Sequence, residues 1–210
     1  MQAAAPQLAI RRVTAGDAAT AAKTLSAAFA NDPALGWILR EGPKRNAARD
    51  LFFDIIVRHV GLPANETWMA SDGSAASIWI PPRTGAKDAR AISLMAELKQ
   101  LPRLAWIFGR PGFARTLKVR AAMDKHHPKN EPHWYLGFLG VAPAFQGQGR
   151  GSQMLKEQFR VIDANRMPAY LEASTEANMR LYLRHGFEVI AKFNPTPDAP
   201  PLWAMWRAPR

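Results

Sequence analysis

The hydrophobic and polar positions of this chain follow two periods, and each period predicts one kind of element. Where apolar residues recur every three or four positions, we expect amphipathic helices. These cover residues 17–30, about 43–60, 87–127 in two or three pieces, about 152–165 and 176–185. Short runs rich in β-branched and aromatic residues predict strands. These cover residues 8–13, 66–71, 75–80, 133–141, 169–172, 187–193 and 202–207.

Capping and turn residues indicate where several of these elements begin and end. Thr14 and Thr175 are expected to cap helices, because a hydroxyl oxygen can accept a hydrogen bond from the first helical turn. The Asp72-Gly73 pair predicts a tight hairpin between two strands. Gly61 is expected to end the second helix, and Trp37 to lie in a loop. The order of elements predicts an α/β fold around a mixed sheet, with a helical insertion at 87–127.

One stretch organises the chain. Residues 133–141 are almost continuously apolar, which is typical of a strand buried on both faces. After a short turn, Gln146-Gly-Gln-Gly-Arg-Gly151 places three glycines at alternate positions, and Leu155, Phe159 and Ile162 then follow a helical period. Free N–H groups at a helix start bind anions, and glycines let a large anion approach the backbone. The order therefore predicts a pyrophosphate-binding loop.

A dinucleotide-binding loop is the first alternative. Gly147 and Gly149 fit the first two positions of the G-x-G-x-x-G/A fingerprint, and Glu172 lies near the distance expected for its acidic residue. The third position is Ser152, however, and the unit comes late in a pattern of mixed strands rather than repeated βαβ units. The Gly-Lys-Ser/Thr ending of a P-loop is absent from the sequence.

The composition narrows the chemistry. The 210 residues, 48% of them hydrophobic and 21% charged, fit one domain with a core. The absence of cysteine excludes a disulfide framework, a thiolate zinc site and a cysteine nucleophile. The adjacent His126 and His127 indicate a helix end rather than a ligand pair, so no metal is expected. The net charge of +11 favours anionic partners, but the basic residues are scattered, so we expect a phosphorylated cofactor rather than nucleic acid.

Targeting signals are not evident in the sequence. The longest uncharged apolar stretch, residues 134–145, is far shorter than the ~20 residues that a membrane helix needs. The start of the chain lacks the basic segment followed by an apolar one that marks a secretory signal. We expect a soluble cytoplasmic protein without a membrane partner, either a monomer or a homodimer.

Two motifs in order resemble one family. Gln146-x-x-Gly149-x-Gly151, preceded by Val141-Ala-Pro143, resembles the acyl-CoA-binding motif of the GNAT superfamily of N-acetyltransferases. Asn178-Met-Arg-Leu-Tyr182, followed by Gly186-Phe187, resembles that family's second conserved segment. The match covers about residues 131–193, whereas the first 130 residues agree in element order only. The resemblance implies one acetyltransferase domain over residues 1–210, with a mostly antiparallel twisted sheet flanked by helices.

Two shorter segments point to a branch of that superfamily. His133-Trp-Tyr-Leu leads into the motif strand, and Pro168-Ala-Tyr-Leu-Glu172 precedes the second motif helix. Both are similar to the puromycin N-acetyltransferase-like branch.

The resemblance implies acetyl-CoA as cosubstrate. The residues that it implies for cofactor binding are Leu139, Val141, Gln146, Gln148, Gly149, Arg150, Gly151, Ser152 and Asn178. Backbone N–H groups of residues 148–152 would bind the pyrophosphate, and backbone groups at Leu139 and Val141 would pair with the pantetheine arm. An amide near Val141 would stabilise the oxygen of the tetrahedral intermediate. The Arg150 side chain either adds charge at this site or is solvated.

Two residues are candidates for catalysis. Tyr182 lies four residues after Asn178, so both share one helix face, and the resemblance places Tyr182 beside the thioester sulfur. A thiol is a stronger acid than a phenol, so a hydrogen bond from Tyr182 to the leaving sulfur suffices. Glu172 is the candidate base, acting directly or through water, because an amine arrives protonated. The alternatives are a packing aromatic for Tyr182 and an arginine-paired surface carboxylate for Glu172.

The acceptor site is expected to be formed by the loop around Asp32 to Trp37, the second helix and the insertion. Asp32 could attract a cationic amine, although the same residue before Pro33 also fits a helix terminator. Trp37 could line the site, although tryptophan more often packs in a core.

The sequence thus predicts an N-acetyltransferase that moves an acetyl group from acetyl-CoA to a primary amine of a small molecule, by direct attack in a ternary complex. The alternatives are acetylation of a peptide or protein amine, and a non-catalytic acyl-CoA-binding regulatory module. The presence of both Tyr182 and Glu172 favours an enzyme over the module.

Overall fold

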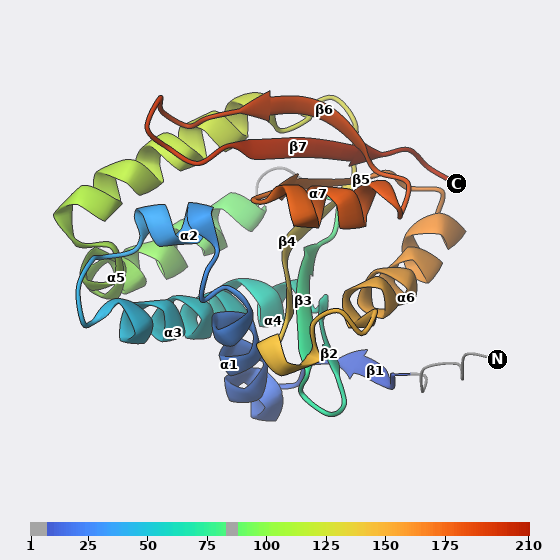
Figure 1. The fold of residues 1–210 in the computed structure, drawn as a ribbon, viewed down its shortest axis with the longest axis horizontal. Coiled ribbons are helices and arrows are strands. Elements are labelled where there is room, and N and C mark those ends of the chain that lie inside the picture. Colours follow the sequence, from blue (N-terminus) through green and yellow to red (C-terminus); the bar gives the residue numbers. More distant parts are fainter. Residues whose placement is uncertain (1–7, 83–87) are drawn as a thin grey trace.

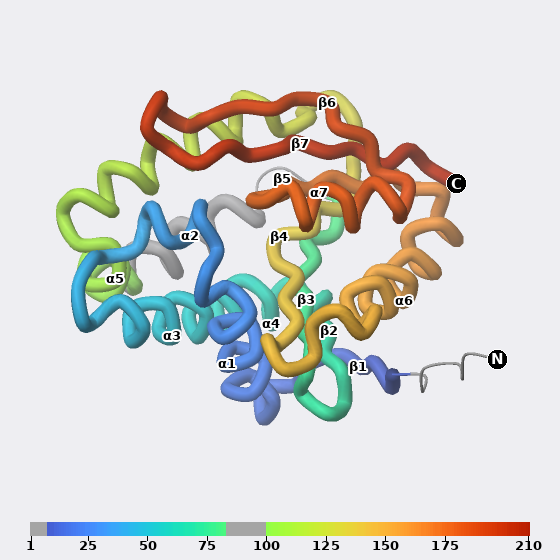
Figure 2. The backbone as a smooth tube through the Cα atoms, in the orientation of Figure 1, coloured from blue at the N-terminus to red at the C-terminus, as the bar shows by residue number. Residues whose placement is uncertain are grey.

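The computed structural model describes residues 8–82 and 88–210, with side chains described for 8–82 and 100–210 (Figures 1 and 2). The helices are η1 Ala15–Asp17, α1 Ala18–Ala28, α2 Pro33–Ile38, α3 Arg45–Ile56, η2 Val57–Gly61, α4 Leu62–Ala64, α5 Asp88–His126, η3 Pro143–Phe145, α6 Arg150–Ala164 and α7 Glu176–Leu183. The strands are β1 Ile10–Arg12, β2 Thr67–Ala70, β3 Ala75–Ile80, β4 Trp134–Val141, β5 Ala169–Ala173, β6 Glu188–Phe193 and β7 Leu202–Arg207.

The seven strands form one mixed sheet in the order β1-β2-β3-β4-β5-β7-β6. All neighbours are antiparallel except β4 and β5, which run parallel. The predicted α/β fold around a mixed, mostly antiparallel sheet is confirmed.

The central strands β4 and β5 pair over a short distance only. Their register runs from Trp134 opposite Ala169 to Leu136 opposite Leu171. Beyond Leu136, β4 continues to Val141 and pairs with β3 alone within the described ranges. One edge of β4 therefore keeps backbone N–H and C=O groups without a strand partner, and such groups need other partners when they are buried.

Helices cover both faces of the sheet. On one face α1 and α3 pack against β2, β3 and β4, with an aromatic cluster of Phe29, Phe52, Phe53 and Phe138 at ring separations of 5.2 to 6.0 Å. On the other face α6 and α7 pack against β4, β5 and β7. Leu155, Phe159 and Ile162 of α6 are buried there, as the helical period predicts.

Two helix boundaries differ from those predicted. The expected loop around Trp37 is the helix α2, because Asp32 caps it by accepting a hydrogen bond from Leu35 N at 2.8 Å and Pro33 begins it. The second helix does not end at Gly61. It continues through the π-helical turn η2 and α4 to Asn65, which is left-handed at φ 54°. Gly61 instead allows close packing, since a Cβ there would lie 2.3 Å from Thr67 Oγ1.

The insertion is one long helical segment with a break. Gly109, at φ 63° and ψ 179°, interrupts α5, so the segment comprises two helices as the sequence predicts. Pro102 lies within the first of these helices rather than at the break. Of the apolar residues that recur along this segment, Ile107 and Phe108 are buried and Leu101 is exposed, whereas Met95 and Leu98 lie outside the described side chains.

No helix in the described part of the chain is long and apolar enough to cross a membrane.

Candidate active site

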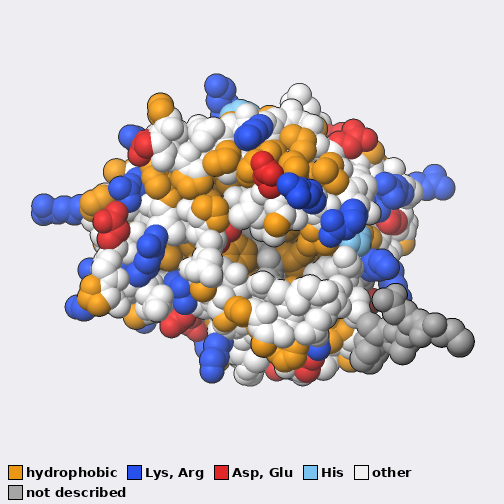
Figure 3. Space-filling view, in the orientation of Figure 1, with side chains coloured by type: hydrophobic (Ala, Val, Ile, Leu, Met, Phe, Trp, Pro, Cys, Tyr) orange, Lys and Arg blue, Asp and Glu red, His pale blue; other side chains and the backbone are white. Residues whose placement is uncertain are grey.

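A cavity of about 590 Å³ opens where β4 and β5 part. Its walls come from the end of α1 and the loop after it, the last residues of β4, the glycine-rich loop with the start of α6, and α7. Figure 3 shows the molecular surface hollowed near the centre of the view, with hydrophobic side chains in the depression. Four segments that are far apart in the sequence therefore meet around one site.

The glycine-rich loop has the geometry of an anion site. Gly147 and Gly149 both adopt φ +75°, a left-handed conformation that other residues rarely adopt, and nothing lies within 4 Å of an added Cβ at either position. The helix α6 begins directly afterwards, and Gln153 N donates to Gly149 O at 3.1 Å. The N–H groups of residues 150–152 precede this first helical bond, so they are available to a bound anion.

The polar side chains of the loop hold its shape. Gln146 Nε2 donates to Val141 O at 3.0 Å, and Gln148 Nε2 donates to Ala144 O at 3.2 Å. Of these two, Gln146 lines the cavity and Gln148 does not. Their amides are therefore engaged with the loop's own backbone.

The Arg150 side chain turns towards the hairpin between β2 and β3. Its guanidinium bonds to the Asp72 carboxylate and the Ser74 hydroxyl, and lies over the Phe145 ring at 4.4 Å. Burial raises the pKa of Asp72, but hydrogen bonds from Ser74 and Arg150 outweigh it and bring the pKa to about 2. Arg150 is thus an ion-paired anchor of the loop, and the anion-binding capacity rests mainly on backbone N–H groups.

The strand and helix walls place the other predicted residues. Leu139 and Val141 line the cavity, and both pack against a small cluster that includes Met154. Thr175 caps α7 by accepting a hydrogen bond from Asn178 N at 3.2 Å, which confirms the predicted cap. Asn178 and Tyr182 line the cavity from one face of α7.

Asp32 also lines the cavity. Besides capping α2, its carboxylate accepts a hydrogen bond from the Ser174 hydroxyl, which joins the α1–α2 loop to the end of β5. Burial and the nearby charge of Asp32 raise the pKa of Tyr182. The Tyr182 phenol is therefore protonated at neutral pH and can donate a hydrogen bond.

Glu172 lies on the face of β5 opposite to the one that packs against α6 and α7. Side chains alternate along a strand, and Ala169, Leu171 and Ala173 face α6 and α7, so Tyr170 and Glu172 face the opposite way. Burial raises the pKa of Glu172 to about 7, although the phenols of Tyr135 and Tyr170 favour its ionised form. Its Oε1 and the Tyr170 hydroxyl are buried without a hydrogen-bond partner within the described residues. A buried oxygen of this kind needs a ligand or water.

Besides Gln148, two predicted residues do not line the described cavity. Glu172 is not part of its wall, but Ser174, two residues further along, contacts Asp32 at its edge. Trp37 lies elsewhere: the Arg115 guanidinium is 5.3 Å from its ring, and Arg115 Nη1 donates to its carbonyl at 3.1 Å.

Comparison of the sequence with known proteins supports the same kind of site. Residues 106–189 match the family described as the acetyltransferase (GNAT) domain. The chain carries a GNAT acetyltransferase domain. This GNAT protein is an acetyl-CoA-dependent acetyltransferase, and the predicted superfamily is confirmed. The puromycin N-acetyltransferase-like branch stays a prediction.

Several relatives of this acetyltransferase carry informative names. It is 27% identical over 188 residues to an uncharacterised N-acetyltransferase of Schizosaccharomyces pombe, covering 86% of this chain and 74% of that protein. It superposes at a TM-score of 0.73 and 26% identity on a solved Corynebacterium glutamicum protein described as histone acetyltransferase HPA2 and related acetyltransferase, with 97% of each chain covered. Arylalkylamine N-acetyltransferase 2 of Aedes aegypti shares the fold, at a TM-score of 0.67 and 12% identity over 97% of this chain and 99% of that one.

Some residues near the site were not predicted from the sequence. Tyr170 could have been found from strand alternation, because it lies two positions before Glu172. Tyr135 stands opposite Tyr170 in the β4–β5 register, which the sequence does not reveal. Ser174 gave no signal, since its contact with Asp32 joins segments 142 residues apart.

Proposed function

We propose that this acetyltransferase transfers the acetyl group of acetyl-CoA to the primary amine of a small molecule by direct attack in a ternary complex. One observation carries the proposal. The gap between β4 and β5 has an anion-binding loop at one end and a protonated Tyr182 in its wall. On the other face of β5, the Oε1 of Glu172 is buried without a hydrogen-bond partner among the described residues.

The site fits the shape and chemistry of acetyl-CoA. The N–H groups of residues 150–152 would bind the pyrophosphate at the start of α6. The unpaired edge of β4 near Leu139 and Val141 would pair with the amide groups of the pantetheine arm, in place of the missing strand. Asn178 would lie beside that arm. Bound acetyl-CoA supplies an activated thioester carbonyl.

Glu172 would then act as the base and Tyr182 as a hydrogen-bond donor, from the two faces of β5. Glu172, directly or through a water, takes a proton from the ammonium so that the amine nitrogen can attack the thioester carbonyl carbon. A C–N bond forms and the C–S bond breaks. A backbone N–H near Val141 stabilises the carbonyl oxygen as charge develops on it. Tyr182 donates a hydrogen bond to the departing thiolate, and the second amine proton leaves to solvent.

The covered acceptor side favours a small amine. The sheet face that carries Tyr170 is packed by Ala34 of α2, by Ala122 and Met123 of α5, and by Phe193 of β6. Figure 1 shows α2 and α5 beside this half of the sheet. A covered face suits a compact amine better than an extended peptide. Asp32, which the sequence suggests for attracting a cation, lies at the edge of the same region. Related structures include enzymes named for agmatine and for arylalkylamines, and one named for histones.

An amine panel tests this proposal. Thiol release from acetyl-CoA would be followed with small primary amines, with peptides that offer a free N-terminus, and with peptides that offer lysine. Products would be identified by mass. We expect small amines to give a kcat/KM at least ~10-fold above the peptides, since the covered acceptor side leaves little room for a chain. A preference for peptides would support protein acetylation instead. Tight CoA binding with no release for any amine would support the regulatory module. The cytoplasmic location, the absence of a metal and the monomeric or homodimeric state stay predictions.

A further inference from the structure

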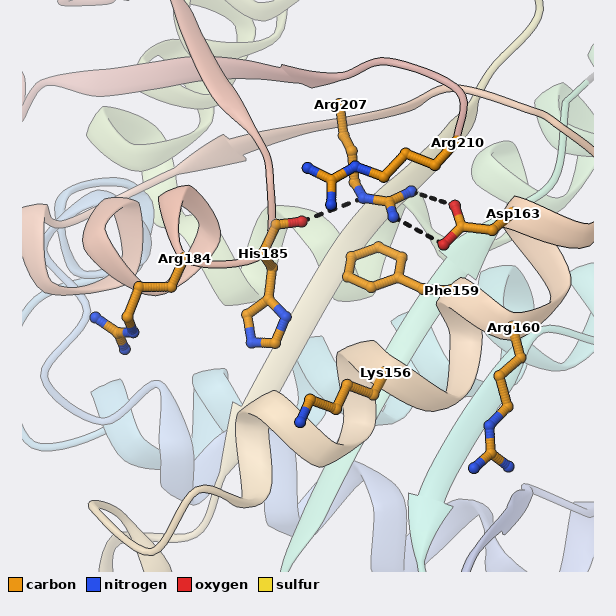
Figure 4. Close-up of a pocket in the computed structure, with 8 residues that line it drawn as sticks. All are labelled: Lys156, Phe159, Arg160, Asp163, Arg184, His185, Arg207 and Arg210. Carbon is orange, nitrogen blue, oxygen red and sulfur yellow. Dashed lines mark hydrogen bonds and ion pairs between the residues drawn. The ribbon is translucent and has the colours of Figure 1, made fainter.

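A second, strongly basic pocket lies beside the cofactor loop. It has a volume of about 340 Å³ and lies between α6, the end of α7 and the end of β7 (Figure 4). Among the residues that line it, the one acidic side chain is Asp163. The five basic side chains are Lys156, Arg160, Arg184, Arg207 and Arg210. The pocket therefore carries a large excess of positive charge.

Two of these cations are already neutralised. The Arg207 guanidinium, only 3% exposed, binds both oxygens of Asp163 at 2.5 and 2.8 Å. Arg160 pairs with Glu157 at 3.0 Å. Within the described residues Lys156, Arg184 and Arg210 have no ion pair. Figure 4 shows Lys156 and Arg184 on two sides of the His185 ring, while Arg160 points away from them.

His185 connects this pocket to the cofactor loop. Its ring Nε2 lies 2.9 Å from Ser152 Oγ, and its carbonyl accepts a hydrogen bond from Arg207 Nε at 3.2 Å. Burial, together with the charges of Lys156, Arg184 and Arg207, lowers the pKa of His185. The ring is therefore neutral at pH 7 and adds no charge between Lys156 and Arg184.

The spacing along α6 places the pocket next to the pyrophosphate loop. Ser152 and Lys156 are four residues apart, so they share one helix face and are separated by ~6 Å along the axis. Arg184 lines both this pocket and the larger cavity. An anion held here would thus be about one helical turn from a pyrophosphate at the loop.

We propose that this basic pocket binds a phosphate monoester, held chiefly by Lys156 and Arg184. The first source is the 3′-phosphate of CoA, which is joined to the pyrophosphate through a single ribose. This assignment rests on the proposed cofactor site. The other source is a separate phosphate from solution. Arg and Lys suit this ligand because their hydrogen bonds to a phosphate are charge-assisted.

Dephospho-CoA, which lacks only the 3′-phosphate, is the matched ligand for a test. Calorimetry would compare CoA with dephospho-CoA on the full chain and on Lys156→Gln and Arg184→Gln. Both substitutions replace exposed side chains. Arg180→Gln is the control variant, because Arg180 lies one turn from Arg184, pairs with Glu176 at 3.0 Å and lines neither pocket. A charge-assisted contact predicts that CoA binds roughly 10- to 100-fold more tightly than dephospho-CoA.

The expected result is that this preference shrinks in Lys156→Gln and Arg184→Gln and persists in Arg180→Gln. Equal affinity for both ligands, combined with binding of inorganic phosphate that only the two pocket variants lose, would assign the pocket to a separate phosphate. Equal affinity without binding of inorganic phosphate would overturn the proposal. Failure of both CoA and dephospho-CoA to bind would instead contradict the proposed cofactor site.

Discussion

Replacing Glu172 by glutamine separates its proposed role as a base from a purely structural one. Glutamine keeps the size of the side chain and removes its ability to take a proton. Because burial raises the pKa of Glu172 to about 7, its ionised fraction changes steeply across the range in which the enzyme can be assayed. The advantage of the native enzyme over Glu172→Gln should therefore depend on pH.

The magnitude follows from that pKa. A positioned general base contributes ~100-fold at the lower end of its usual range. With a pKa of about 7, the carboxylate is ~90% ionised at pH 8 but only ~3% ionised at pH 5.5. The ratio of kcat/KM between native enzyme and variant should fall from ~100 at pH 8 to ~4 at pH 5.5.

Thiol release from acetyl-CoA with one amine, measured from pH 5.5 to 8.5, gives this ratio directly. Ionisation of the amine affects both proteins alike and cancels in the ratio. Glu176→Gln is the matched control, because this exposed carboxylate on α7 lines neither cavity and should give a ratio near 1 throughout. A large ratio that stays constant across the pH range would refute the reasoning, since it would mean that the variant is impaired without loss of a titrating base.

Three further predictions concern the same region. Tyr182→Phe should lower kcat by roughly 10- to 100-fold, the range for a hydrogen bond to a charged group, with CoA affinity by calorimetry unchanged; native turnover in the folded variant would remove Tyr182 from the mechanism. Glu172→Gln should be more stable than the native protein at pH 8 by up to ~3 kcal/mol. The pKa of Glu172 is about 7 in the folded protein and 4.5 as its ordinary value, so the stability of the native protein falls as pH rises from 4.5 to 7. Urea unfolding at pH 4 and pH 8 checks that the difference in stability vanishes in acid. Gly140→Ala should lower the free energy of unfolding by ~1–3 kcal/mol, because the added Cβ would lie 2.7 Å from Ala28 Cβ and 3.1 Å from Leu25 Cδ2. Gly137→Ala is the control in the same unfolding assay, because a Cβ there meets nothing closer than 3.7 Å.

The parts of the site that depend on local pattern could be predicted from the sequence. The buried stripe of α6, the Thr175 cap and the shared face of Asn178 and Tyr182 all follow from helical spacing. Each involves residues within a few positions of one another, where the chain's own geometry determines which side chains meet.

The parts that depend on tertiary contacts could not be predicted. Arg150 meets Asp72 and Ser74 from more than 70 residues away, so the sequence left open whether its side chain adds charge at the anion site or is solvated. The early end of β4–β5 pairing, which creates the cavity, has no signature in either strand. The helix α2 was missed for a different reason. Asp32-Pro33 was interpreted as a terminator of the first helix, although the same pair also suits the start of the next one.

Direct transfer between two bound substrates is the central claim, and a single-turnover measurement tests it most directly. The protein would be mixed with acetyl-CoA, first alone and then with a reactive amine, while free thiol and intact protein mass are followed. Direct transfer predicts no thiol release and no change in protein mass before the amine is added, and then one thiol for each acetylated amine. Thiol release before the amine is added, with acetyl bound covalently to the protein, would contradict it.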